Sequence, residues 1–191
     1  MIFKETAIPG AYLVEPEPIG DERGHFARTW CRQEFEARGL NARLVQCSTS
    51  FNAKAGTLRG LHYQAPPHME AKLIRCTRGA LFDVIVDLRK GSPSYGKWAA
   101  LELSAGNGHM VYIPEGIAHG FQTLVPETEV FYQISTHYAP ESAAGISWDD
   151  PDLSIDWPPA AERIISPADA RHPRFAHAEP LPVALDSGRQ D

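Results

Sequence analysis

Short apolar segments separated by turn residues dominate the chain between residues 43 and 135. They begin roughly ten residues apart and are rich in β-branched and aromatic side chains, a pattern typical of β-strands. Few stretches show a helical period, so we expect an all-β chain, an antiparallel sandwich or barrel with a few short helices. The predicted strands cover residues 43–50, 58–64, 72–77, 81–88, 97–103, 109–113, 119–125 and 130–135.

Two of the predicted strands differ in the sheet position that we expect for them. Leu81–Leu88 is almost wholly apolar, which is typical of a central strand covered on both faces. Asp83 lies within it and needs a partner if it is buried. Residues 12–15 form a further candidate strand close to several prolines, which favours an edge position or an extended entry to the fold. Residues 25–30, after the turn signal at 21–24, form another candidate strand.

The length of 191 residues suits a single domain with a substantial core. We place this domain over residues 1–175, because little periodicity is left in residues 176–191, which we expect to form a surface tail. Short helices are expected at 33–38, ended by Gly39, and at 166–171, where Ser166 is a good N-cap.

Composition excludes several classes of function. The net charge of −6 and the pI of about 5.7 provide no general basic field for nucleic acid, so an anionic ligand needs a local basic pocket. No apolar run is long enough to cross a membrane, and the N-terminus lacks a signal-peptide pattern. Three scattered cysteines form no C-x-x-C pair, which favours a reducing cytoplasm. No Walker loop, G-x-G-x-x-G or G-x-S-x-G is present.

The chemistry of the chain is concentrated in residues 56–64, GTLRGLHYQ, together with Lys72. Strict strand alternation predicts that Arg59 and Tyr63 point to one face and His62 to the other. A cation that can hold an anion, an imidazole and a second cation suit proton transfer beside a carbonyl of a negatively charged substrate. A surface ion pair at Arg59 and a structural His62 form the alternative interpretation.

A second motif, Pro114–His119 (PEGIAH), matches the P-x-G-x-x-H turn of the cupin barrel. Its proline and glycine build a turn, and His119 then begins a strand that faces the cavity. Metal-binding cupins carry H-x-H on an earlier strand, whereas this chain has His62-Tyr63-Gln64 and lacks the second histidine. We therefore expect no catalytic metal, and a His119 hydrogen-bonded below the site remains an alternative.

The chain as a whole resembles the dTDP-4-dehydrorhamnose 3,5-epimerase family across roughly residues 2 to 170. The resemblance implies a cupin-type β jelly roll, a homodimer, no metal or other cofactor, and a nucleoside-diphosphate 4-keto-6-deoxyhexose as substrate. It is carried by the runs DERG at 21–24, GTLRGLHYQ at 56–64, DVIVDLR at 83–89, SPxYGxW at 92–98, IPEGIAHGF at 113–121, YAP at 138–140 and WDDP at 148–151.

The resemblance also implies four catalytic residues. His62 would be the base that removes the proton next to the 4-keto group, and Asp169 would hold its other ring nitrogen. Lys72 would face the keto oxygen and stabilise the enolate. Tyr132 would return a proton to the opposite face, which inverts the centre. A buried structural tyrosine and a surface lysine are the alternatives for the last two.

The substrate's nucleotide end would be bound by a second group of residues. Arg59 and Gln46 would hold the diphosphate, and Tyr138 would stack near the base. Arg23 and Phe26 would meet the nucleoside from the neighbouring subunit.

Two positions depart from the family pattern, and both belong to nucleotide recognition. The family usually has a glutamate at Arg28 and an asparagine at Ser48. We therefore keep open a CDP-, GDP- or UDP-linked sugar, and a mono-epimerase that acts at C3 or C5 alone. A metal-dependent cupin and a non-catalytic cupin that binds a sugar nucleotide are two further hypotheses.

Overall fold

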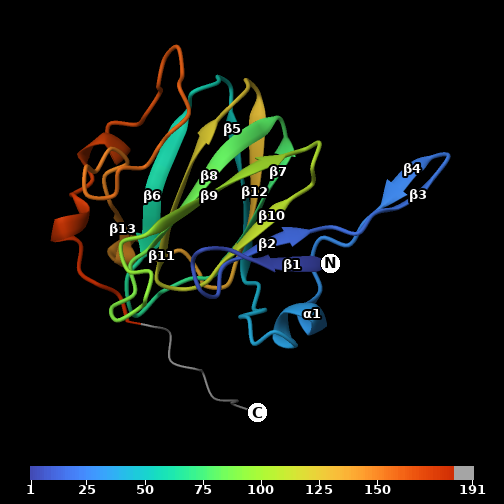
Figure 1. Ribbon diagram of the computed structural model, residues 1–191, viewed down its shortest axis with the longest axis horizontal. Helices are drawn as coiled ribbons and strands as arrows, with labels where there is room; N and C mark the ends of the chain where they lie inside the picture. The colour runs from blue at the N-terminus through green and yellow to red at the C-terminus, as the bar shows by residue number, and fades with distance from the viewer. Residues whose placement is uncertain (183–191) are drawn as a thin grey trace.

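The computed structural model describes residues 1–182 and contains two antiparallel sheets packed face to face (Figure 1). The all-β sandwich expected from the sequence is confirmed. One sheet has the order β1 (Ile2–Glu5), β2 (Tyr12–Glu15), β10 (Met110–Ile113), β7 (Lys72–Arg78), β12 (Thr128–Ile134), β5 (Gln46–Asn52). The other has the order β13 (Ala143–Gly145), β6 (Leu58–Gln64), β11 (Ile117–Thr123), β8 (Ala80–Asp87), β9 (Trp98–Ser104).

Strand β8 has the central position that its apolar sequence predicts, paired with β11 on one side and β9 on the other. Leu81 and Ile85 face the core between the sheets, whereas Val84 and Val86 face a second apolar layer outside. Both faces are covered, so the strand needs no polar face. Each such fully buried side chain contributes about 1.5–3 kcal/mol of transfer free energy.

The outer face of the six-stranded sheet is covered near the N-terminus by helix α1 (Arg32–Glu36). Phe35 is its buried residue and packs with Leu73 and Tyr112. Cys31 makes no side-chain capping bond, so packing rather than capping stabilises this short helix. Gly39 follows the helix with a φ of +69°, as expected of a glycine that ends one.

The outer face of the five-stranded sheet is covered by the C-terminal part of the chain. This part contains the 3₁₀ turns η1 (Pro140–Ser142), η2 (Asp169–Arg171) and η3 (Phe175–His177). Leu181 is 3% exposed, and its N–H donates to the carbonyl of Leu88 at 2.8 Å. The packed chain therefore extends to Leu181, beyond the tail boundary at residue 175. The rest of the expected tail, 183–191, lies outside the described residues.

Two local predictions near the N-terminus are wrong. Residues 12–15 are not an edge strand, because β2 lies between β1 and β10. The nearby prolines flank the strand rather than interrupt it, so they remove no ladder hydrogen bond. The strand predicted over residues 25–30 is only β4 (Gly24–Phe26), paired with β3 (Ile19–Asp21) in a separate hairpin.

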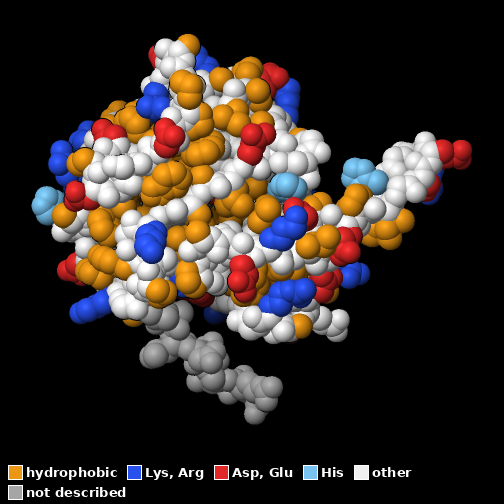
Figure 2. Space-filling view, in the orientation of Figure 1, with side chains coloured by type: hydrophobic (Ala, Val, Ile, Leu, Met, Phe, Trp, Pro, Cys, Tyr) orange, Lys and Arg blue, Asp and Glu red, His pale blue; other side chains and the backbone are white. Residues whose placement is uncertain are grey.

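The β3–β4 hairpin projects from the body of the molecule (Figures 1 and 2). Ile19 and Phe26 on it are both 76% exposed. An isolated two-stranded hairpin is marginally stable in water and normally needs a surface to pack on.

No helix within residues 1–182 has the length and apolar character needed to cross a membrane.

Candidate active site

A cavity of about 710 Å³ opens between the two sheets at one end of the sandwich. The strands become more polar toward that end. Along β7 the inward side chains run from Cys76 and Ile74 to Lys72, and along β12 from Val130 to Tyr132. The same sheets therefore provide a dry core at one end and a polar cavity at the other.

Strand β6 brings Arg59 and His62 to the same wall, although strict alternation predicts opposite faces. His119 pairs with His62, and Phe121 with Arg59, so two residues of β6 lie opposite one of β11. This β-bulge reverses the phase of the strand. Gly60 is required there, because its φ is +124° and a Cβ on it would lie 2.6 Å from Gly120 Cα.

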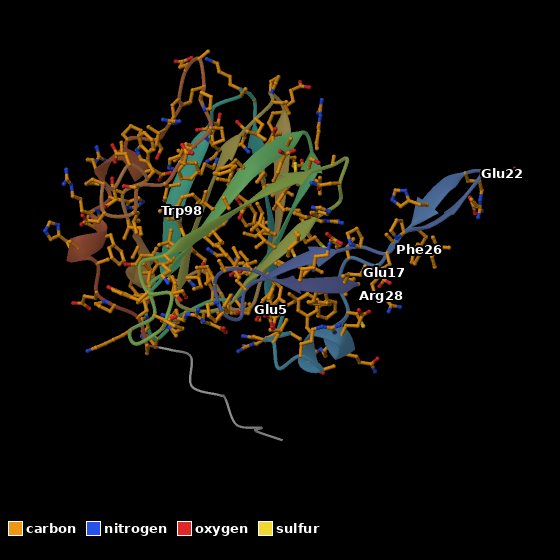
Figure 3. The ribbon with its side chains drawn as sticks, in the orientation of Figure 1. Glu5, Glu17, Glu22, Phe26, Arg28 and Trp98 are labelled. Carbon is orange, nitrogen blue, oxygen red and sulfur yellow. The ribbon has the colours of Figure 1, made fainter. Side chains whose placement is uncertain are left out.

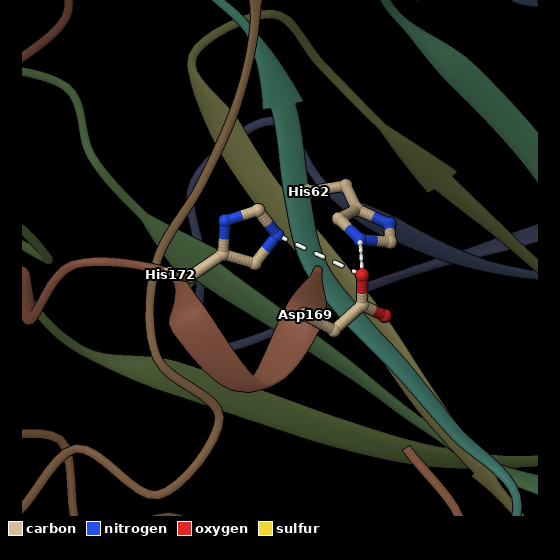
Figure 4. Close-up of side chains that lie close together, drawn as sticks. All are labelled: His62, Asp169 and His172. Carbon is tan, nitrogen blue, oxygen red and sulfur yellow. Dashed lines mark hydrogen bonds and ion pairs between the residues drawn. The ribbon is translucent and has the colours of Figure 1, made fainter. Parts of the chain in front are cut away.

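His62 and Asp169, which the resemblance pairs, are hydrogen-bonded at 3.0 Å between Nε2 and Oδ1 (Figure 4). The other carboxylate oxygen of Asp169 accepts the N–H of Gly60 at 3.1 Å. With Nε2–H donating to this carboxylate, Nδ1 is the ring nitrogen with a free lone pair. The geometry therefore prepares His62 to accept a proton, whereas its role as the base stays a prediction.

The environment of this pair favours a neutral imidazole and a charged carboxylate. Burial lowers the pKa of His62, Asp169 opposes that effect, and the charges of Lys72 and His172 add to it. Burial alone would raise the pKa of Asp169, but its hydrogen bonds from Gly60 and His62 hold that pKa below its usual value. A neutral imidazole is the form that can act as a base.

Tyr132 on β12 lies across the cavity from β6, on the facing sheet. Burial, together with the charge of Asp83, raises the pKa of Tyr132, so its hydroxyl keeps its proton at neutral pH. Its ring meets the His119 ring edge to face, with centroids 6.2 Å apart. Tyr132 is thus a protonated acid on the wall opposite His62.

His119 lines the cavity and is 4% exposed. Its Nε2 lies 2.8 Å from Oδ2 of Asp83, which is fully buried. This is the partner that Asp83 was expected to need. Both interpretations of His119 therefore have support, since the side chain lines the cavity and is held by a hydrogen bond beneath it.

Lys72 reaches the cavity from β7 and is 9% exposed. Its Nζ forms an ion pair with Glu70 at 2.8 Å, and Glu70 also lines the cavity. Such an ion pair holds the Lys72 side chain in place. The pairing of Glu70 with Lys72 was not predicted from the sequence.

The residues predicted to meet the diphosphate, Arg59, Gln46 and Ser48, all line the cavity. Asn52, which was not predicted as a site residue, accepts a hydrogen bond from Arg59 Nε at 2.8 Å. This leaves the two terminal nitrogens of the guanidinium to bind an anion. Gln46 accepts the backbone N–H of Tyr138 at 2.6 Å and so holds Tyr138 at the mouth of the cavity, where it is 64% exposed.

Three of the predicted binding residues lie outside the cavity of their own chain. Phe26 is on the projecting hairpin and Arg28 follows it (Figure 3). Arg23 is at the hairpin turn, paired with Asp21 at 2.5 Å, and Arg28 is paired with Glu34 at 3.1 Å. Within one chain, the structure does not bring these three together with the other predicted site residues.

His172 was not predicted and lies beside the His62–Asp169 pair (Figure 4). It lines the cavity, and the ligand atoms of His62, Asp169 and His172 all lie within 4.8 Å of one another. This cluster is the set of side chains among residues 1–182 that could hold a metal ion. In the sequence, a histidine three residues after a carboxylate is a weak signal of a binding site. Only the fold brings the third member of the cluster, His62, beside them.

Comparison with known proteins links this geometry to a family. The sequence profile described as dTDP-4-dehydrorhamnose 3,5-epimerase matches residues 5–177. The protein of that name from Sinorhizobium fredii is 42% identical over 185 residues, covering 97% of this chain and 93% of the relative.

Two solved structures have the same fold. A dTDP-6-deoxy-D-glucose-3,5-epimerase from Legionella pneumophila, in complex with dTDP-4-keto-L-rhamnose, superposes with a TM-score of 0.90 at 36% identity, covering 96% of this chain and 98% of that one. ChmJ, a 3′-monoepimerase from Streptomyces bikiniensis in complex with dTDP-quinovose, has a TM-score of 0.83 at 33% identity, covering 90% and 86%.

Proposed function

Because the chain belongs to the dTDP-4-dehydrorhamnose 3,5-epimerase family, we propose that it epimerises a nucleoside-diphosphate 4-keto-6-deoxyhexose of the dTDP-4-dehydro-6-deoxyglucose type. The reaction inverts C3, C5 or both, by proton removal and an enolate. The observation that carries the proposal is a histidine oriented by a carboxylate on one cavity wall, facing a protonated tyrosine on the other. No metal takes part in the proposed steps.

The first step is abstraction of the proton next to the ketone by Nδ1 of His62. Such a proton is too weakly acidic for imidazole unless the enolate is stabilised. The Lys72 ammonium, held by Glu70, is the group proposed to face the keto oxygen. A preorganised cation in a dry site typically lowers the barrier by several kcal/mol.

The second step is return of a proton to the opposite face of the enolate by Tyr132. The raised pKa keeps the phenol protonated before the reaction. Once the phenol has given its proton to the substrate, the nearby positive charge of Arg59 stabilises the phenolate that is left. Inversion follows because the base and the acid belong to different sheets. A single group acting on one face would exchange the proton without inverting the carbon.

The nucleotide end of the substrate would extend toward Arg59, Gln46, Ser48 and Tyr138. Arg59 is the main candidate for the diphosphate, since its terminal nitrogens remain available. Tyr138 is exposed at the mouth and can stack on a base. The relatives named above are dTDP-sugar enzymes, which favours a dTDP-linked substrate over its CDP, GDP and UDP counterparts.

We further propose a homodimer in which the β3–β4 hairpin completes the partner's site. The support is the exposure of Ile19 and Phe26 on a projecting ribbon that lacks a surface of its own to pack on. Arg23 and Phe26 would then meet the nucleoside in the second subunit's cavity. Sedimentation equilibrium tests the dimer, and a monomer at micromolar concentration would refute it.

We also propose that the protein works in the cytoplasm. Its three free cysteines suit a reducing compartment.

The deciding experiment incubates the protein in D₂O with dTDP-4-keto-6-deoxyglucose and follows C3 and C5 by NMR. Deuterium at both carbons indicates a double epimerase, whereas deuterium at one carbon indicates a mono-epimerase. The mono-epimerase is a genuine second candidate, because the similar ChmJ is a 3′-monoepimerase. No exchange with the dTDP, CDP, GDP or UDP sugars would refute the proposed function.

A further inference from the structure

His172 carries a buried nitrogen that the proposed reaction does not use. Its Nε2 is shielded from solvent and has no hydrogen-bond partner among residues 1–182. This atom lies 3.8 Å from Oδ1 of Asp169, the oxygen that His62 Nε2 contacts at 3.0 Å. Two imidazole nitrogens therefore converge on one carboxylate oxygen (Figure 4).

The fold holds these three side chains close together before any ligand binds. Asp169 and His172 lie on the same turn, and the N–H of His172 donates to the carbonyl of Asp169 at 3.2 Å. Gly145, which pairs with His62 across β13 and β6, leaves room for the second ring. A Cβ on Gly145 would lie 2.5 Å from His172 Nε2, so any other residue there would displace the imidazole.

We propose that His62, Asp169 and His172 form a binding site for a transition-metal dication, with Zn²⁺ as the preferred ion. Two imidazole nitrogens and a carboxylate oxygen are a common ligand set for zinc, which also accepts a fourth, exchangeable ligand. Bond lengths of about 2.0–2.2 Å in a tetrahedron separate neighbouring ligand atoms by roughly 3.3–3.5 Å. The observed separations of 3.0 and 3.8 Å lie on either side of that range.

Metal at this site would inhibit the enzyme by changing the tautomer of His62, an effect that rests on the proposed function. The ion takes the lone pair of Nε2, so the proton that Nε2 carried moves to Nδ1 by way of solvent. Nδ1–H has no lone pair with which to remove a substrate proton. The ring stays neutral overall, and the site gains the two charges of the ion.

Calorimetric titration of the full chain with Zn²⁺, Co²⁺ and Mg²⁺ tests the site. Zn²⁺ should bind one ion per chain more tightly than Co²⁺, whereas Mg²⁺ should not bind, because it prefers oxygen ligands. His172→Ala should weaken Zn²⁺ binding by more than about tenfold, and so should His172→Asn, which retains a polar side chain. His109→Ala is the matched control, since His109 also lies near a carboxylate, Glu15, but within residues 1–182 no second imidazole joins this pair.

The same samples test inhibition, with each variant compared with its own metal-free rate. Zn²⁺ should suppress deuterium exchange in the unaltered protein and in His109→Ala, and a chelator should restore it. Zn²⁺ binding that is equally tight in His172→Ala, or absent in the unaltered protein, would overturn the site. Binding that depends on His172 but leaves exchange unaffected would support the site and refute His62 as the base.

Discussion

The two ends of the proposed substrate path are built in different ways. At the sugar end, His62 extends from β6 of one sheet and Lys72 from β7 of the other, and each contacts a carboxylate at 3.0 Å or less. At the nucleotide end, Phe26 lies on a hairpin away from the body, and Arg28 is exposed beside Glu34 (Figure 3). His62 and Lys72 line the cavity of their own chain, whereas Phe26 and Arg28 lie outside it.

This difference follows from what each end has to do. Proton transfer depends on distances of a few ångströms, so its groups need rigid support from strands and neighbouring side chains. Recognition of a nucleoside tolerates more movement and can be supplied by a projecting segment of a second subunit. We therefore expect substitutions at the sugar end to change the rate, and those at the hairpin to change affinity.

The largest effect is expected for His62→Ala. Loss of the base should lower epimerisation and C–H exchange on the order of 10²- to 10⁴-fold, the range that a positioned general base contributes. Deuterium incorporation measured by NMR tests this. His68→Ala, outside the cavity, is the control. Exchange that survives His62→Ala at the normal rate would show that another group is the base.

Tyr132→Phe should separate exchange from inversion. The base and the enolate stabiliser remain, so deuterium should still enter the substrate, while the inverted product falls on the order of 10²-fold. NMR of the product mixture reports both quantities. Equal loss of exchange and inversion would contradict an acid that acts only on the opposite face.

Asp169→Asn should lower kcat/KM by roughly 10- to 100-fold, the equivalent of a charge-assisted hydrogen bond of about 1.5–3 kcal/mol. In the unaltered protein, activity should be lost as pH falls through the pKa of His62, which burial places below its usual value. Asp169 raises that pKa, so its loss should move the acid limb to still lower pH. A pH–rate profile tests the sign, and a shift to higher pH would contradict it.

Phe26→Ala should raise KM about tenfold or more and leave kcat nearly unchanged. The expected loss is that of one stacked base, about 1–3 kcal/mol, which is a binding contribution common to ground and transition states. Initial-rate kinetics separate the two constants. Ile19→Ala, on the same hairpin, is the control for a general effect on dimer assembly. A fall in kcat alone would place Phe26 in the chemical step.

The smallest effect is expected for Arg28→Glu, which restores the residue usual in the family. An exposed ion pair with Glu34 contributes at most about 1 kcal/mol, so stability should change little. The ratio of kcat/KM between dTDP- and CDP-linked substrates should shift a few-fold. An unchanged ratio would mean that Arg28 takes no part in choosing the nucleotide.

The sequence determined the architecture because alternation and turn chemistry are local properties. The succession of strands and the central position of the apolar β8 could be predicted from these local patterns. The motifs at residues 56–64 and 114–119 identified the family, which the comparison confirms. Ser48 and Gln46 are two residues apart, so strand alternation puts them on the same face of β5, which lines the cavity.

Only the tertiary structure decided how the reactive groups meet. Asp169 lies 107 residues from His62 in the sequence, and the packing of the C-terminal segment on β6 brings the two together. The bulge at Gly60 placed Arg59 beside His62, against the alternation of an ideal strand. The same packing brings the ring of His172 to within 5.5 Å of the ring of His62, measured between centroids. Contacts between distant segments depend on the whole packed chain, and no short stretch of sequence contains them.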